Sequence, residues 1–239
     1  MDVCKVTALV PMKHHSERVP GKNFRLLAGK PLYRWILDTL LSSCYVSEVI
    51  INTDSHLLLE NSFLNGHPKV ILRKRKPEIC GDRVSMNKVI ADDLQAYPRD
   101  SYLMTHATNP FISLDTLNKA IRSYYSNLVK GLDSLFSVNI HQTRMYDQYL
   151  SPVNHSVGEL LRTQDLPPLY EENSCLYLFS QDSFMSTQNR IGRKPGIYAT
   201  PKMESLDIDN QDDWSHAEWA AAWGQMHSGE KVTVHHEVS

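Results

Sequence analysis

The sequence predicts an α/β protein whose sheet is mostly parallel and carries helices on both faces. Over residues 1–140, short apolar runs alternate with amphipathic stretches, a pattern typical of strand–helix–strand units. The apolar runs have the length of single strands and are rich in β-branched residues. With 239 residues, of which 41% are hydrophobic, the chain has the size and composition of one globular domain.

The first part of this pattern is regular. The run at 5–10 predicts a buried strand that stops at Pro11 and is followed by a polar loop, and residues 31–43 predict a helix because their apolar side chains share one face. Further strands are expected at 48–54, 70–74, 101–108 and 134–139, and further helices at 56–64, 84–97 and 113–127. Ser113 would be the N-cap of the last of these helices.

The pattern breaks after residue 140. Residues 140–174 are polar, aromatic and proline-rich without a clear period, so we expect an irregular insertion that acts as a lid or a dimerisation arm. Strands at 175–180, 197–201 and 204–210 and a helix at 212–223 are expected to follow. We therefore expect a single domain over 1–225 and a polar tail over 226–239.

Charge and cysteine content narrow the class of function. The 25 basic and 27 acidic residues give a net charge of −2, which argues against a nucleic acid as partner because such proteins usually carry a basic excess. The four cysteines lie far apart, without the spacing of a zinc site or a disulfide framework, so we expect a reducing, cytoplasmic compartment. No apolar stretch approaches the roughly 18 residues of a membrane span, so no membrane partner is expected.

The loop after the first expected strand is a candidate phosphate site. Ligands of doubly wound sheets bind beyond the carboxyl ends of the strands. This loop holds a serine and four cations, namely Ser16, Lys13, Arg18, Lys22 and Arg25. Cations and backbone N–H groups together can offset the charge of a polyphosphate. Composition alone fits a solvated basic loop about equally well.

Two carboxylates near the C-terminus are a candidate metal site. Asp207 and Asp209 lie two residues apart on the strand expected at 204–210, so both would point to the same face. Two carboxylates beside phosphate oxygens suit Mg²⁺, which is a hard cation. The pair indicates a nucleotide with a bound metal rather than one particular reaction, and a solvated strand end is the alternative.

A series of short motifs occurs in a fixed order along the chain. The first is the loop with Ser16, Pro20, Lys22 and Asn23, followed by Ala-Gly-Lys-Pro-Leu at 28–32. The others are Asn-Thr-Asp at 52–54, the stretch from Arg75 to Asp82, Thr-Asn-Pro at 108–110, Gln-Asp-Leu-Pro-Pro at 164–168 with Asn173, and Ser-Leu-Asp-Ile-Asp at 205–209. In this order and spacing the chain resembles the acylneuraminate cytidylyltransferase family.

The resemblance implies a fold, a reaction and a set of site residues. It implies a Rossmann-like sheet of the nucleotide-diphospho-sugar transferase type, in which CTP and a sialic-acid-like sugar acid give a CMP-sugar and pyrophosphate. The implied catalytic residues are Lys22, Arg18, Asp207 and Asp209, the last two holding Mg²⁺, and the implied nucleotide-binding residues are Lys13, Ser16, Asn23, Arg75 and Asp82. The small acidic sugar is expected at His106, Arg162, Gln164, Asn173 and Tyr177. A homodimer is also implied, with 140–174 reaching the partner subunit.

The chain departs from the family pattern at several positions. Lys13 replaces an arginine, His14 and His15 stand where small residues are common, and Glu17 takes the place of a triphosphate-binding lysine. A carboxylate beside a triphosphate is repulsive on the order of kcal/mol, so either Glu17 turns away and Arg18 takes over its role, or the polyphosphate lies differently. On the acceptor side, His106 replaces a glutamine and Glu171 an arginine.

These departures leave more than one function open. Because the changes concentrate on the acceptor side, we expect N-acetylneuraminic acid to be a poor substrate and a differently decorated acid to be the true one. One alternative is the same fold with another acceptor, such as a different keto-acid sugar or a phosphonate. The other is a non-catalytic nucleotide-binding relative, which Glu17 favours. Pyrophosphate release from CTP with a panel of acids separates the catalytic functions from binding alone.

Overall fold

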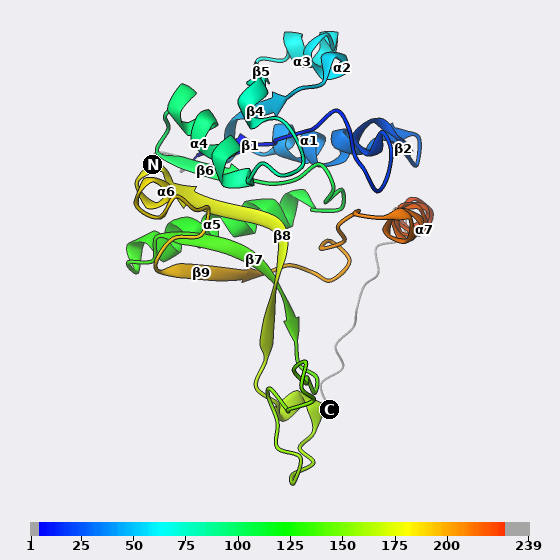
Figure 1. The fold of residues 1–239 in the computed structure, drawn as a ribbon, viewed down its shortest axis with the longest axis vertical. Helices are drawn as coiled ribbons and strands as arrows, with labels where there is room; N and C mark the ends of the chain where they lie inside the picture. Colours follow the sequence, from blue (N-terminus) through cyan, green and yellow to red (C-terminus); the bar gives the residue numbers. More distant parts are fainter. Residues whose placement is uncertain (1–4, 228–239) are drawn as a thin grey trace.

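The computed structural model describes residues 5–227, which contain a seven-stranded sheet flanked by helices (Figure 1). The strand order is β5-β4-β1-β6-β8-β7-β9. The strands are β1 Val6–Leu9, β4 Val46–Thr53, β5 Val70–Lys74, β6 Ser101–Met104, β7 Ser134–His141, β8 Leu169–Ser180 and β9 Pro195–Ala199. β8 runs antiparallel to β6 and β7, and the other neighbours are parallel. The mostly parallel α/β sheet predicted from the sequence is confirmed.

Helices cover both faces of this sheet, as expected. α1 (Leu32–Ser42) and α5 (Leu114–Val129) pack into one apolar cluster, and α4 (Met86–Ala96) and α6 (Gln181–Thr187) pack into another on the opposite face. Successive residues of β1 contribute to different clusters, Ala8 to the first and Leu9 to the second, because side chains alternate along a strand. Ser113 caps α5 as predicted, accepting a hydrogen bond from the Thr116 N–H at 3.2 Å.

Short elements connect the layers. The expected helix at 56–64 is two pieces, α2 (His56–Leu59) and α3 (Ser62–Gly66). A second, two-stranded sheet of β2 (Leu26–Leu27) and β3 (Lys30–Pro31) leads into α1. The two residues of its turn, Ala28 and Gly29, both have positive φ angles, of 49° and 81°, as a two-residue hairpin turn requires. The Ala-Gly-Lys-Pro-Leu motif therefore forms this turn and the start of α1.

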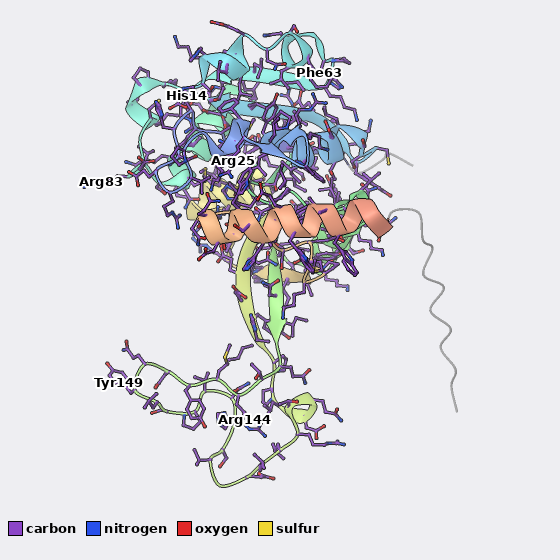
Figure 2. The ribbon with its side chains drawn as sticks, turned by 90° about the vertical axis from the view of Figure 1, so that its right-hand side faces the viewer. His14, Arg25, Phe63, Arg83, Arg144 and Tyr149 are labelled. Carbon is purple, nitrogen blue, oxygen red and sulfur yellow. The ribbon has the colours of Figure 1, made fainter. Side chains whose placement is uncertain are left out.

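β7 and β8 leave the sheet together as a two-stranded ribbon that carries residues 142–168 away from the body (Figures 1 and 2). The insertion expected at 140–174 is therefore less irregular than predicted, since 169–174 belongs to β8. The ribbon is exposed, as are Tyr170, Glu171 and Glu172 on it. It lacks the apolar alternation of a half-buried strand because neither face packs on a core. The single-domain boundaries and the dimerisation role of this arm stay predictions.

The strand expected at 204–210 is wrong, because this segment is a loop that leads to α7 (Gln211–His227). Its alternation of apolar and acidic residues comes from packing beneath α7, where Ile208 is fully buried against Trp214. The Ile208 N–H donates to the Thr108 carbonyl at 3.0 Å, which fixes the loop beside the end of β6. Most of the expected tail at 226–239 lies outside the described residues. Within 5–227 the helices are too short or too polar to cross a membrane.

Candidate functional site

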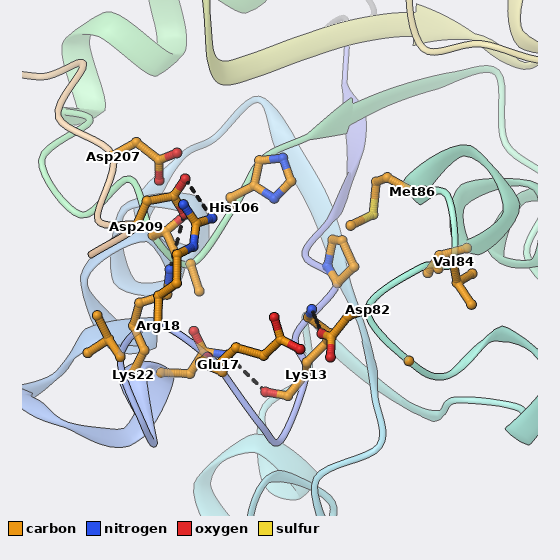
Figure 3. A pocket seen from close by; sticks show the side chains of 18 of the residues that line it. Lys13, Glu17, Arg18, Lys22, Asp82, Val84, Met86, His106, Asp207 and Asp209 are labelled. Carbon is orange, nitrogen blue, oxygen red and sulfur yellow. Dashed lines mark hydrogen bonds and ion pairs between the residues drawn. The ribbon is translucent and has the colours of Figure 1, made fainter. Parts of the chain in front are cut away.

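A pocket of about 510 Å³ opens where β1, β5 and β6 end (Figure 3). Its walls come from the loops that follow these strands, from β8 and from the loop before α7. The predicted site residues that line it are Lys13, Ser16, Arg18, Lys22, Asn23, Arg75, Asp82, His106, Asp207 and Asp209. Glu17 and Ser174 also line it, with an apolar edge of Ile79, Val84, Met86 and Val89. This is the position at which open α/β sheets bind ligands.

Cations and carboxylates meet at one side of the pocket (Figure 3). The Arg18 guanidinium lies 3.0 Å from one oxygen of Asp209, and the Lys22 ammonium lies 3.5 Å from the other. Lys22 also donates to the Ile208 carbonyl, which connects the loop after β1 to the loop before α7. Only 9% of Lys22 is exposed, and this burial lowers the pKa of its amine despite the two nearby aspartates. Lys22 is therefore a poorly hydrated cation facing the pocket.

Asp207 lies beside this group with an oxygen that lacks a partner. Its Oδ1 is buried and makes no hydrogen bond within residues 5–227. Burial raises the pKa of the carboxyl, and a hydrogen bond with Thr108 opposes the rise. An orphaned carboxylate oxygen next to a second carboxylate fits a divalent cation, since Mg²⁺ commonly takes one or two carboxylates and completes its shell with phosphates and water. The described residues offer no cluster of three His, Cys, Asp or Glu for a metal held by protein alone.

The opposite side of the pocket carries a second ion pair, between Lys13 and Asp82 (Figure 3). The Lys13 ammonium lowers the pKa of the Asp82 carboxyl. The Asn23 side chain donates to the Lys13 carbonyl at 3.0 Å, so Asn23 holds the loop in place. In Figure 3 the Glu17 carboxylate extends toward Lys13 and Asp82 rather than toward Lys22. Glu17 is thus turned away from the cations that face Asp209.

A buried network that the sequence did not predict orients Arg75. The guanidinium donates to the side-chain oxygen of Asn52 at 2.9 Å and to the Asn52 carbonyl at 2.8 Å. The Asn52 amide in turn donates to Asp93 at 2.6 Å, and Asp93 pairs with Arg73. Because Asp93 only accepts, it fixes which end of the amide faces Arg75. The Asn-Thr-Asp motif pointed to Asn52, but nothing in the local sequence pointed to Asp93 in the following helix.

His106 lies at the end of β6 between the two sides of the pocket (Figure 3). Burial, reinforced by the positive charges of Arg190 and Lys22, lowers its pKa to about 4. The imidazole is therefore neutral near pH 7 and can both donate and accept a hydrogen bond, as the amide of a glutamine does.

We expect His106→Gln to make the fold less sensitive to acid. An unfolded histidine binds a proton below about pH 6.5, whereas His106 in the folded chain binds one only below about 4. The free energy of unfolding of the wild type should therefore fall as the pH drops through this window, and not above it. Between pH 7 and 4.5 the free energy of unfolding should fall by on the order of 1–2 kcal/mol more in the wild type than in the variant. Urea unfolding at each pH measures this difference. Equal losses in both proteins would contradict the burial of a neutral imidazole.

The remaining predicted acceptor residues do not line the pocket of the single chain. Arg162 and Gln164 lie at the far end of the arm, where Arg162 is 73% exposed and pairs with Asp165 at 2.7 Å. Asn173 is buried, donating to Thr200 and accepting from Ser137, both at 2.6 Å. Tyr177 is buried with its hydroxyl on Glu172. Their roles toward an acceptor stay predictions.

Two positions that break the family pattern have structural partners. The His14 N–H donates to Asp54 at 2.7 Å, and its ring contacts the Ser55 hydroxyl at 2.9 Å, so His14 anchors the loop. Glu171 lies on the ribbon, 2.6 Å from His141. Because Glu171 faces its neighbouring strand and not the pocket, the expectation that an acid at 171 shapes the acceptor site has no support within one chain.

Known proteins resemble this chain over most of its length. The model of a family described as cytidylyltransferase matches residues 7–231. An N-acylneuraminate cytidylyltransferase of Streptococcus agalactiae serotype III is 26% identical over 89% of this chain and 52% of its own length. A CMP-N,N′-diacetyllegionaminic acid synthase of Legionella pneumophila is 25% identical over 88% of this chain and 94% of its own. The chain thus spans about half the length of the first of these relatives.

Solved structures share the fold at lower identity. A CMP:2-keto-3-deoxy-manno-octonic acid synthetase complexed with CTP superposes with a TM-score of 0.64 at 15% identity, covering 92% of this chain and 99% of that one. A 4-diphosphocytidyl-2C-methyl-D-erythritol synthase from Anaerococcus prevotii gives a TM-score of 0.63 at 11% identity, covering 92% of this chain and 96% of that one. The predicted fold type is confirmed by these two matches.

Proposed function

Because the chain belongs to the cytidylyltransferase family, we propose that it transfers CMP from CTP to a sugar acid and releases pyrophosphate. One observation carries the proposal. A single pocket at the strand ends combines Arg18 and Lys22 with the two carboxylates of Asp207 and Asp209. Cations beside a carboxylate pair suit a nucleoside triphosphate with its metal. The non-catalytic alternative requires the same binding groups but no turnover.

The chain's own residues account for most of the chemistry. Arg18 and Lys22 would neutralise the phosphates, with Ser16 adding a hydrogen bond, and Arg75 and Asp82 would contact the nucleotide at the other side. Asp207 and Asp209 would hold Mg²⁺, which when bound neutralises developing charge on the phosphate oxygens. The anomeric hydroxyl of the acid then attacks the α-phosphate while pyrophosphate leaves. Catalysis of this kind depends on positioning and charge stabilisation, with little covalent work for the protein.

The acceptor is tested by a panel of acids with CTP and Mg²⁺. Relatives are named for N-acylneuraminate, for N,N′-diacetyllegionaminic acid and, in Campylobacter jejuni, for pseudaminic acid. We propose a sialic-acid-like acid other than N-acetylneuraminic acid, since the rigid ring of His106 stands where the family has the flexible side chain of a glutamine. Pyrophosphate release is measured with these acids, 2-keto-3-deoxy-manno-octonic acid and an alkyl phosphonate. Release with none of them contradicts an enzyme for such acceptors, and efficient use of N-acetylneuraminic acid contradicts the narrower choice.

We expect the nucleotide site to prefer CTP over ATP and GTP by at least about tenfold, or about 1.4 kcal/mol. Met86 belongs to the apolar edge of the pocket that Arg75 and Asp82 also line, and we propose that a pyrimidine ring lies against this edge. Calorimetric titration with each nucleotide in the presence of Mg²⁺ measures the ratio. UTP is the matched control, because it keeps the ring size and changes only the hydrogen-bonding edge. Equal affinities for all four nucleotides would contradict the assignment.

The exposed arm bears on how the chain assembles. The arm beyond β7 and β8 projects from the body and exposes Tyr149, Leu150 and Leu160, so we propose that it contacts a second copy in a homodimer. Light scattering of the full chain tests this against a variant with serine at these positions. A cytoplasmic location rests on cysteine spacing alone.

A further inference from the structure

Arg190 forms a partly buried polar cluster behind the His106 side of the pocket. Its guanidinium lies 3.7 Å from the centre of the Tyr177 ring and donates to the Tyr177 hydroxyl at 2.9 Å. It also reaches Glu172 at 3.4 Å, and 19% of its side chain is exposed. Stacking on an aromatic ring holds a guanidinium in a fixed plane. Arg190 is therefore an oriented cation that follows α6 in the chain.

An irregularity in β8 connects this cluster to the pocket through Ser174, while Arg190 and Tyr177 lie behind the lining residues. Between Phe136 and Val138 of β7, the paired position on β8 moves from Tyr177 back to Glu172, so β8 bulges there. In the bulge Ser174 has a φ of 57°, an uncommon conformation outside glycine. Ser174 lines the pocket, and its hydroxyl lies 3.2 Å from that of Tyr177. Bulges near active sites re-aim side chains in this way.

The other cations of the pocket are engaged at its phosphate and nucleotide sides. Arg18 and Lys22 face Asp209, Lys13 faces Asp82, and Arg75 is held by Asn52. The charge of Arg190 acts on His106, as that of Lys22 also does. The Arg190 Nε–H makes no hydrogen bond within residues 5–227, and the contact with Glu172 is long for a charged pair. The Arg190 guanidinium thus has an N–H group free to donate a hydrogen bond to an anion that enters beside His106.

We propose that Arg190 binds the carboxylate of the sugar acid from within the same subunit. This inference rests on the proposed function and adds how the acceptor is recognised. A guanidinium can grip a carboxylate through two parallel hydrogen bonds. Glu172, 3.4 Å from Arg190, would compete with the incoming acid. Arg162 then has no need to reach across from the arm of another subunit.

The test compares Arg190→Gln with Arg193→Gln in pyrophosphate-release kinetics, using the acid that the wild type turns over and the methyl ester of that acid. Arg193 lies in the same segment and does not line the pocket, and its guanidinium donates to the Ser186 carbonyl at 3.4 Å, so it is the matched control. We expect Arg190→Gln to raise KM for the acid at least about tenfold while KM for CTP stays within about twofold. Its preference for the acid over the ester should collapse by the same factor. A purely structural role of Arg190 would not change that preference.

Two further variants keep the result decisive if Arg190→Gln folds poorly. Arg190→Lys retains the charge and should recover part of the preference for the acid. Glu172→Gln removes the competitor and should lower KM for the acid, the opposite direction from a damaged site. The proposal is overturned if the wild type itself does not distinguish acid from ester, or if Arg162→Ala raises KM for the acid and Arg190→Gln does not. Failure of the wild type to release pyrophosphate or bind any acid in calorimetry overturns the proposed function as well.

Discussion

Asp209→Asn should lower kcat/KM for CMP-sugar formation at least about a hundredfold, because neutralising phosphate charge supplies several kcal/mol. Asp209 contacts both Arg18 and Lys22, and it is one of the two carboxylates that would hold Mg²⁺. An asparagine keeps the shape of the side chain but removes the charge that orders these groups. The Asp209 side chain is 45% exposed, so its loss should cost the fold little. Thermal unfolding and steady-state kinetics measured on one preparation separate the two effects.

Asp212→Asn is the matched control for this variant. Asp212 is exposed, lies three positions further along the chain and does not line the pocket. The same change of charge there should leave turnover within about twofold of the wild type. Near-normal turnover of Asp209→Asn, or full activity of the wild type in excess EDTA, would refute the carboxylate site.

Much of the fold could be predicted because the buried strands have a strong local signature. β1, β4 and β6 lie between two layers of helices, so they read as continuous apolar runs. The loop at 204–210 was predicted as a strand because its sequence has a similar local signature. Alternation of Leu206 and Ile208 with acids suggested a strand, but the apolar side chains pack beneath α7, and the segment pairs with no strand within residues 5–227. The alternation of apolar and polar residues indicates which side chains are buried, but it does not indicate which element they pack against.

The two sides of the site differ in how far the sequence could predict them. The phosphate side lies on two short motifs, around Lys22 in the segment after β1 and around Asp209 in the loop before α7. The acceptor side depends on a bulge in β8 and on the pairing of distant segments. Arg190 reaches Tyr177 across 13 residues of sequence, and no local period indicates such a contact. The segment that supplied Arg162 as a candidate lies instead on the arm.

Lys22→Met is expected to separate activity from stability. The Lys22 ammonium lies within the wall that faces Asp209 and donates to the Ile208 carbonyl. If this cation stabilises charge on the reacting phosphate, its removal should lower kcat/KM at least about a hundredfold, as the loss of one well-placed donor does in other enzymes. Methionine keeps most of the length of the side chain and none of its charge.

Stability should respond to Lys22→Met in a different way. Burial lowers the pKa of the Lys22 amine, so the folded chain holds the ammonium at a cost that methionine does not carry. The variant loses the hydrogen bond to Ile208, which offsets part of that gain, and its unfolding temperature should stay within a few degrees of the wild type. Because the cost disappears as Lys22 loses its proton, the wild type should gain stability relative to the variant as the pH rises toward 10.

Lys13→Met is the control for activity. Lys13 is more exposed and pairs with Asp82, so the kcat/KM of this variant should fall by less than about tenfold. Equal losses of activity in the two variants would mean that Lys22 acts only through the general positive charge of the loop.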